Sequence, residues 1–506
     1  MNTRFKFLIY LACALVLISS CKKEDAERPE PAPAIAGLES EYYVVIKTSL
    51  LLKPTIENRV DSIVWMLNGQ RAANALQYNF QAPADPGTYN LIIMAYNKGN
   101  IAQKVIKITT GRYLNWQTTT NKILTLEASQ KFTNRNDVKW EVLSASSELY
   151  RLSVSNAATA LFTAVNKGTY HLKVSAGDLV DTLLITVRQP DRAPSPYIAK
   201  VFDYLPAPGQ FVNELPQYVE GDTYETMVAK AGKDLIGADA NTITLGGWGG
   251  YVVMGFDHTI VNVSGRRDFR IHGNAFGANA NPRPNAPFGG SCEPGIIMVA
   301  YDKNKNGKPD EDEWYEIKGS GNFTAENEPW YSAAVQRKND TRTIRNYEMS
   351  YHRPKTEAAS APAGHIGISD YILWTDNQGG QGYKIKNTYH SQSYYPAWMK
   401  DNKLTYKGIR LASNGIEESG QGSYFVLYAF RYGYVDNYPN AHDNSGIDID
   451  WAIDKNGNKV NLPGIDFIKV YNGIDQENGW LGEASTEVSR GEDLHLLGTN
   501  IATINQ

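Results

Sequence analysis

The segment FTAVNKGTYHLKVSAGD, residues 162–178, decides the fold class, because apolar and polar side chains alternate along it after a Gly-Thr-Tyr turn. A period of two residues is typical of a strand with one buried face. The residues predicted to face the core are Tyr170, Leu172, Val174 and Ala176.

An earlier part of the chain repeats this pattern. VWMLNG (64–69) precedes FQAPADPGTYNLIIMAYNKGN (80–100), as VKWEVLS (138–144) precedes the segment above. Both copies place a Trp on an early strand, then a Phe, a Gly-Thr-Tyr turn and an alternating strand. The repeat predicts two small β-sandwich modules, residues 39–110 and 111–190, with Tyr89 and Tyr170 as core or corner residues. It resembles PKD-type immunoglobulin-like modules, which implies a spacer role.

The segment RQPDRAPSP (188–196) predicts a domain boundary, because it has three prolines and no apolar periodicity. Residues 196–500 are expected to form one large jelly-roll-like β-sandwich, so the whole chain is predicted to be all-β. One helix is expected over residues 222–232. The predicted strands of this domain are 251–256, 259–263, 268–273, 295–301, 344–352, 403–411, 424–430 and 464–471.

The amino-terminal segment has the layout of a bacterial lipoprotein signal. Arg4 and Lys6 precede the apolar run FLIYLACALVLI, and SSC follows it. We expect residues 1–20 to be a signal peptide and Cys21 to carry lipid, with 21–38 as a tether; an ordinary signal with an incidental Cys is the alternative. KKEDAE after Cys21 resembles the tag that directs lipoproteins of the Bacteroidetes to the outer face of the outer membrane.

Composition limits the possible partners. The chain has 506 residues, enough for about three domains, and a formal net charge of −4. Without a basic surplus, nucleic acid is not expected as a partner. The 31 tyrosines and 10 tryptophans favour strands and aromatic binding surfaces. Cys292 is expected to be a buried thiol.

A calcium-type loop lies in AYDKNKNGKPDEDEWYEI, residues 300–317. Gly307 permits a sharp bend, while Pro309 and the strand-forming flanks depart from a helix–loop–helix site. We therefore place the loop between two strands, with calcium in a structural role; a plain Asn-Gly turn without metal is the alternative. The predicted ligands are Asp302, Asn304, Asn306, the Lys308 carbonyl, Asp310 and Glu313.

A second ion is a further hypothesis. RRDFRIHGNAF (266–276) and CEPGIIMV (292–299) resemble the paired strands of calcium-bearing jelly rolls, where Asp268, Asn274 and Glu293 would converge. Surface acids with separate partners are the alternative.

The large domain is similar to a family of cell-surface lipoproteins of gut Bacteroidetes over residues 196–490. The similarity lies in segments such as GGWGGYVVMGFDHTIVN, EPGIIMVAYDKNKNGKPDEDEWYEI and IDWAIDKNGNKVNLPGIDFIKVYNG. The branch considered is that of the BtuH-type vitamin B12-binding lipoproteins. The resemblance implies capture of cobalamin or another corrinoid outside the cell and transfer to a TonB-dependent transporter of the outer membrane.

Two aromatic stretches have the composition that an amide-fringed macrocycle requires, WTDNQGGQGY and YHSQSYYPAW. A packed aromatic cluster of loops is the alternative for both. His390 could ligate cobalt, although a hydrogen-bonding role is commoner. The predicted contacts are Trp374, Asn377, Gln378, Tyr383, Tyr389, His390, Gln392, Tyr394, Tyr395 and Trp398.

Two other functions compete with corrinoid binding. Glycans also stack on Trp and Tyr and hydrogen-bond to amides, so a glycan-binding lipoprotein is the second hypothesis. A hydrolase is the third, because Asp and Glu are plentiful. The sequence has no G-x-S-x-G, H-E-x-x-H or P-loop motif, so the protein is expected not to be an enzyme.

Overall fold

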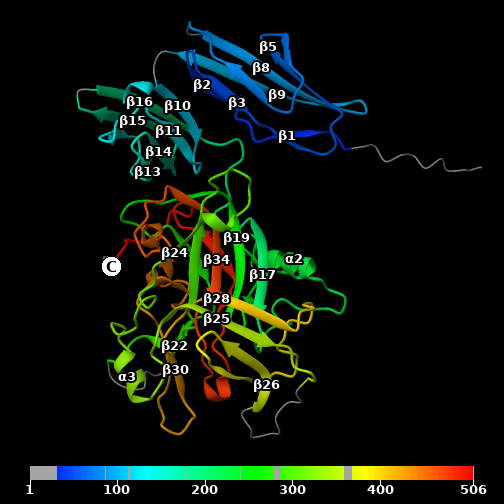
Figure 1. Ribbon diagram of the computed structural model, residues 1–506, viewed down its shortest axis with the longest axis vertical. Helices are drawn as coiled ribbons and strands as arrows, with labels where there is room; N and C mark the ends of the chain where they lie inside the picture. Colours follow the sequence, from blue (N-terminus) through cyan, green and yellow to red (C-terminus); the bar gives the residue numbers. More distant parts are fainter. Residues whose placement is uncertain are drawn as a thin grey trace, which may run out of the picture. The chain divides into compact units, whose positions relative to one another are not determined.

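The computed structural model describes residues 31–504, apart from residues 86, 112–113, 178, 240, 279–284 and 358–366. The predicted signal peptide and the lipidation site Cys21 lie outside the described residues. The chain divides into two compact units, one ending at Asn115 and one beginning at Trp116, which are described separately (Figure 1).

The first unit is a small β-sandwich. Its largest sheet has the order β2-β9-β8-β5-β6, and Trp65 on β5 is fully buried beneath it. Tyr89 packs against Phe80, with ring centroids 5.3 Å apart, so its predicted place at the core is confirmed. The strands are β1 (Ala34–Ala36), β2 (Glu41–Val45), β3 (Ser49–Leu52), β4 (Thr55–Glu57), β5 (Ser62–Leu67), β6 (Gln70–Ala73), β7 (Tyr78–Gln81), β8 (Gly87–Asn97) and β9 (Asn100–Gly111).

The second module belongs to the second unit. It pairs a four-stranded sheet, β10-β16-β15-β12, with a three-stranded sheet, β11-β14-β13. The four core residues predicted on β15 are buried, and the Tyr170 hydroxyl donates to the Asn166 carbonyl at 3.0 Å. The strands are β10 (Leu114–Thr119), β11 (Leu124–Glu127), β12 (Lys139–Ala145), β13 (Tyr150–Asn156), β14 (Thr159–Ala164), β15 (Gly168–Ala176) and β16 (Leu179–Arg188).

The large domain, which we call the head, is built around a seven-stranded antiparallel sheet of order β17-β19-β34-β23-β24-β33, with β31 paired to β23. The two strands predicted over 251–263 are one long strand, β19. The strands are β17 (Lys200–Ala207), β19 (Gly247–Val261), β23 (Gly295–Ala300), β24 (Trp314–Ile317), β31 (Tyr434–Val435), β33 (Ala452–Ile453) and β34 (Gly464–Asn472).

Smaller sheets complete the head. A four-stranded sheet has the order β27-β26-β25-β28, and another has the order β21-β22-β30-β29. The prediction that the chain is all-β is thereby confirmed. The remaining strands are β18 (Ile243–Thr244), β20 (Phe269–His272), β21 (Phe276–Gly277), β22 (Gly289–Ser291), β25 (Ile344–His352), β26 (Gly367–Asp376), β27 (Gln381–Asn387), β28 (Lys403–Arg410), β29 (Gly415–Glu417), β30 (Phe425–Tyr428), β32 (Gly446–Ile447), β35 (Glu487–Val488) and β36 (Arg490–Asp493).

One face of the main sheet is buried in the largest core. Helix α2 (Tyr224–Leu235) covers β17 there and contributes Met227, Ala231 and Leu235 (Figure 1). The helix predicted over 222–232 is present, but it begins at Tyr224, after the Thr223 side chain that accepts a hydrogen bond from the Thr226 amide, and it continues past Gly232 to Leu235. A second helix, α3 (Tyr331–Gln336), was not predicted. No helix among the described residues has the length and apolar character to cross a membrane.

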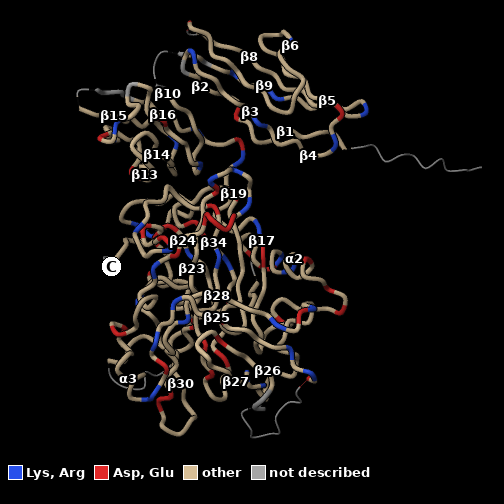
Figure 2. The backbone as a smooth tube through the Cα atoms, in the orientation of Figure 1, with Lys and Arg blue, Asp and Glu red and all other residues tan. Residues whose placement is uncertain are grey.

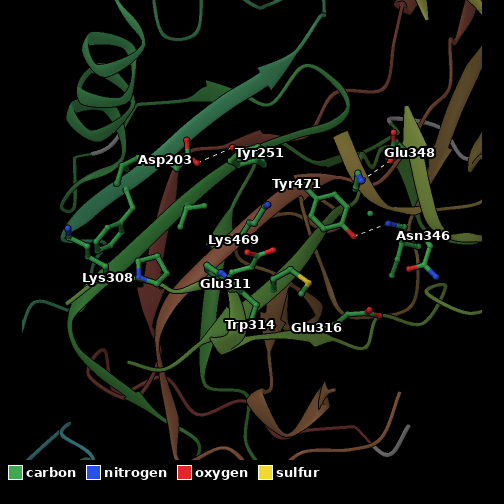
Figure 3. A pocket seen from close by; sticks show the side chains of 18 of the residues that line it. Asp203, Tyr251, Lys308, Glu311, Trp314, Glu316, Asn346, Glu348, Lys469 and Tyr471 are labelled. Carbon is green, nitrogen blue, oxygen red and sulfur yellow. Dashed lines mark hydrogen bonds and ion pairs between the residues drawn. The ribbon is translucent and has the colours of Figure 1, made fainter. Parts of the chain in front are cut away.

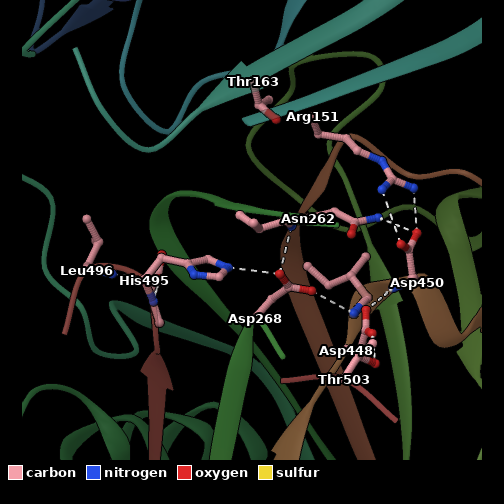
Figure 4. Close-up of polar contacts among 12 residues, drawn as sticks. Arg151, Thr163, Asn262, Asp268, Asp448, Asp450, His495, Leu496 and Thr503 are labelled. Carbon is pink, nitrogen blue, oxygen red and sulfur yellow. Dashed lines mark hydrogen bonds and ion pairs between the residues drawn. The ribbon is translucent and has the colours of Figure 1, made fainter. Parts of the chain in front are cut away.

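The second module is bonded directly to the head (Figure 4). Arg151 on β13 donates to Asp450 at 2.5 and 3.1 Å, and the buried Thr163 hydroxyl donates to the Pro463 carbonyl at 2.6 Å. Val165 packs against Val261 at the end of β19. The proline-rich segment 188–196 therefore joins two parts of one compact unit.

Replacing Arg151 should weaken this junction. Both side chains of the Arg151–Asp450 pair are largely buried, 14% and 17% exposed, so Arg151→Ala leaves a buried carboxylate without its partner. We expect a loss of about 3 kcal/mol in the free energy of unfolding, measured by chemical denaturation. Lys173→Ala breaks the exposed pair with Glu141 and should cost less than about 1 kcal/mol. Equal effects of the two variants would contradict the junction's role.

Candidate binding site

A cavity of about 1090 Å³ opens on the face of the main sheet opposite the largest core (Figure 3). Strands β17, β19, β34, β23 and β24 contribute its floor, and β25 and β28 contribute one wall. The loop residues Lys308, Pro309 and Glu311 supply part of the rim. Its aromatic lining consists of Phe202, Tyr251, Trp314 and Tyr471.

Strand register places a row of side chains across the cavity floor. Asp203 pairs with Val253, Val253 with Lys469, Lys469 with Met298, and Met298 with Glu316. Because neighbouring strands are about 4.8 Å apart, this row carries one acid near each end and a lysine at its centre. All five residues line the cavity.

The two acids of the row have fixed partners. Glu316 binds Arg345 through two hydrogen bonds of 2.8 and 3.0 Å, and this pairing raises the pKa of Arg345. Asp203 accepts hydrogen bonds from the hydroxyls of Tyr224 and Tyr251, the latter at 3.0 Å. Burial and the proximity of Asp203 raise the pKa of Tyr251 far above its usual value, so the hydroxyl stays protonated as a donor.

The lysine at the centre has an aromatic neighbour. Its ammonium lies 4.1 Å from the centroid of the Tyr251 ring, within the range of a cation–π contact. Burial lowers the pKa of Lys469, and the charge of Asp203 partly offsets this. Figure 3 shows the Lys469 side chain projecting among the lining residues.

This arrangement is suited to holding a large ligand of mixed polarity. The volume lies at the upper end of the roughly 300–1,000 Å³ common for small-molecule sites. Rings, donors and acceptors alternate around it, and Figure 2 shows acidic and basic residues interspersed along the head. The cavity can therefore meet an apolar ring system and its polar substituents together.

None of the ten predicted ligand contacts lines the cavity. Three of them are core residues, because the loop 389–398 folds inward: Tyr394, Tyr395 and Trp398 are 0%, 1% and 6% exposed. Trp398 stacks between Tyr204 and Tyr218. For these three, the prediction of a contact surface is wrong, and the alternative of a packed aromatic cluster is correct.

The other predicted contacts lie at the surface or serve the fold. Trp374 lies over Gly382, where a Cβ atom would come within 2.6 Å of the indole. The Asn377 amide donates to the Asn346 carbonyl at 2.9 Å, tying the turn to β25. His390 packs edge-on against Phe211, and Gln392 donates to the Gln210 carbonyl. The exposed members are Asn377, Gln378, Tyr383 and Tyr389.

The sequence nevertheless held a signal for the cavity. Charged residues interrupt apolar strand segments, such as Lys469 within GIDFIKVY and Glu316 within WYEI. In a strand, such interruptions share a face with residues two positions away. Across several strands they mark a polar sheet face, but only the pairing order shows that they meet.

The calcium-type loop connects β23 to β24, as predicted. Gly307 has a φ of 75°, which allows the sharp bend. The side chains of Asp302, Asn304, Asn306 and Asp310 converge: both Asn amides donate to Asp310, at 2.6 and 2.7 Å. Rotating these amides would present oxygens instead, so the donor set fits a hard cation.

The end of this loop is fixed by Glu313. Its buried carboxylate accepts from the backbone amides of Lys303 at 2.7 Å and Asp310 at 3.2 Å. The Lys308 amide donates to the Asn306 side chain at 2.8 Å. Lys308, Pro309 and Glu311 also line the cavity, so this loop forms part of the binding site.

Of the three residues predicted to hold a second ion, Asp268 does not lie with the other two. Asp268 accepts from the amides of Val263 and Ile449, both at 2.8 Å, and from His495 (Figure 4). It precedes β20, whereas Asn274 follows the same strand, so the strand separates them. Asn274 lies with the predicted Glu293 at a different cluster.

That cluster holds Glu293, Asp436 and Glu487, with carboxylate oxygens within 4.8 Å of one another. The Asn274 amide donates to Glu487 at 3.1 Å. Burial and mutual repulsion raise the pKa of Glu293 from 4.5 to about 8, and burial raises that of Asp436 to about 7. An oxygen-only set of this kind could hold a divalent cation.

The cluster should make stability depend on pH. As pH rises from about 4.5 to about 8, the unfolded chain releases protons that the folded cluster retains, so the free energy of unfolding falls. With a chelator present, Glu293→Gln should therefore gain a few degrees in thermal midpoint over the unmodified protein at about pH 8, and little at about pH 4.5. Glu326→Gln at an exposed position is the control. A gain independent of pH would contradict this account.

Comparisons with known proteins give only weak structural matches. No family model and no curated protein matches the chain. A structure of titin domains Z1Z2 in complex with telethonin is 16% identical, covering 32% of this chain and 100% of that chain, with a TM-score of 0.14. Fibronectin(III)-like modules of Clostridium thermocellum CbhA are 13% identical, covering 31% and 94%, with a TM-score of 0.16. Scores this low carry no argument about the site, and the β-sandwich assignment rests on the strand pairings.

Proposed function

We propose that this protein is a lipid-anchored, surface-exposed outer-membrane protein whose head binds cobalamin or a related corrinoid. It passes the corrinoid to a TonB-dependent transporter system and does not transform it. The observation that carries the proposal is the large open cavity on the face of the main sheet.

The chemistry of the lining supports a corrinoid in this cavity. A corrinoid is a broad macrocycle with amide groups around its edge, which need both donors and acceptors. Tyr251, Trp314 and Tyr471 offer aromatic surface, while Asn346 and Glu348 on β25 offer polar groups at the wall. Because Arg345 is already bound to Glu316, that wall is ordered by its own ion pair and needs little rearrangement on binding.

Structural calcium in the Asp302–Glu313 loop is part of the proposal. The loop supplies the oxygen donors described above and also part of the cavity rim. A bound cation would replace the amide contacts to Asp310 by ion coordination and so hold the rim in place.

Glycan capture is the second candidate, and it would use another surface. Tyr389 is 73% exposed and Trp480 is 43% exposed. Asn387 links them, because it donates to the Trp480 carbonyl at 2.9 Å and accepts from the Tyr389 amide at 2.8 Å. Exposed rings beside amides can stack on sugars.

A cobalamin co-elution experiment tests the proposed function. The chain expressed from Lys22, incubated with cyanocobalamin and desalted, should carry the red chromophore with it. Tyr389→Ala should not change this, because Tyr389 lies outside the cavity lining. Colourless protein that instead binds on a glycan panel, with loss of glycan binding in Tyr389→Ala, would favour the second candidate. Release of new products from a bound glycan would favour a hydrolase.

Calcium titration calorimetry tests the loop. Asp310→Asn should remove one binding event, because Asp310 is the acid on which the loop side chains converge. At 100 times Kd, calcium should add about 2.7 kcal/mol to the stability of the unmodified protein. Asp454→Asn alters a plain hairpin turn with Asn456 and Asn458 and should leave the titration unchanged. An unchanged titration in Asp310→Asn would remove the loop as a metal site.

A further inference from the structure

We infer that Lys469 is the anion anchor of the cavity, and that it binds a phosphodiester oxygen of the ligand. This inference rests on the proposed function and specifies which corrinoids the cavity prefers. It predicts a preference for complete cobalamin, whose nucleotide loop contains one phosphodiester, over cobinamide, which lacks that loop.

The position of Lys469 supports this role. It lies on β34, which is bordered by β19 on one side and β23 on the other. On the same strand, Ile468 and Val470 point into the main core, so alternation directs Lys469 to the cavity. The ammonium is thus held at the middle of the floor by a strand that cannot shift without exposing core residues.

The charges around it show that Lys469 is available to a ligand. Among the other basic residues that line the cavity, Arg345 is bound to Glu316, Lys407 is bound to Glu348 at 2.9 Å, and Lys200 and Lys308 are exposed to solvent. Among the described residues, no carboxylate lies within ion-pair distance of the Lys469 ammonium. Its close neighbour is the Tyr251 ring.

The neighbouring acid, Asp203, acts on Lys469 through its charge but does not form an ion pair with it. Asp203 already accepts two hydroxyl hydrogen bonds, from Tyr224 and Tyr251. A partly buried ammonium without an ion-pair partner gains more from a charged acceptor than from a neutral amide, because charge-assisted hydrogen bonds are the stronger kind. Amide groups around a macrocycle cannot supply that charge, whereas a phosphodiester can.

Equilibrium binding of two corrinoids tests the inference. Cyanocobalamin and dicyanocobinamide are titrated against the chain expressed from Lys22 and against Lys469→Met, which keeps the stem of the side chain and removes its charge. Lys469→Met should bind cyanocobalamin about 10- to 100-fold more weakly and dicyanocobinamide about equally well. Lys403→Met removes an exposed cation on β28 that lies outside the cavity lining, so it should leave both affinities nearly unchanged. Circular dichroism and a melting curve establish that each variant folds.

The outcomes separate this inference from the proposed function. If cyanocobalamin binds both proteins equally, or if both corrinoids weaken equally, Lys469 is not a phosphodiester anchor although corrinoid binding stands. If neither corrinoid binds the unmodified chain, the proposed function fails. Inorganic phosphate then tests the anchor alone, with the lysines labelled as ¹³C-dimethyl amines for NMR. The resonance absent from Lys469→Arg should shift with phosphate, and a resonance that does not move would overturn the inference.

Discussion

The two-residue alternation of the seven-stranded sheet is the constraint on which the head depends. On β34, Ile468 and Val470 enter the main core while Lys469 and Tyr471 face the cavity. A slip of one residue would reverse these faces and bury a charge. The apolar set thus fixes the register, and the register determines which polar groups share the cavity floor.

Ion pairs then give the cavity its electrostatic character. Glu316 with Arg345 and Glu348 with Lys407 are neutral pairs within or beside the lining. An entering molecule then meets aromatic surface, hydrogen-bonding groups, the ammonium of Lys469 at the floor and the exposed ammonium groups of Lys200 and Lys308. The loop that follows β23 adds a rim whose geometry comes from its own converging side chains, so the fold and the site share residues throughout.

Local sequence patterns predicted the strands, the helix and the calcium-type loop. They did not predict the cavity, because long-range strand pairing brings its residues together. Strand positions such as 344–352 and 464–471 and the helix capped by Thr223 followed from periodicity and capping. The loop beginning at Asp302 was also placed correctly between strands. Trp398 was misjudged, because aromatic loop residues have the same composition whether they fold inward or outward. The members of the row from Asp203 to Glu316 are spread over residues 203–469, because Lys469 lies at its centre, and no local window shows that they meet.

The bonds between the second module and the head have a practical consequence for dividing the chain. A fragment that began within residues 188–196 would expose Val261 and Val263 to solvent. It would also leave the Pro463 carbonyl without the hydrogen bond that it accepts from the buried Thr163 hydroxyl. Such a fragment would expose a contiguous apolar surface, which favours self-association in solution. The safer cut lies ahead of Leu114, where the strands of the second module begin.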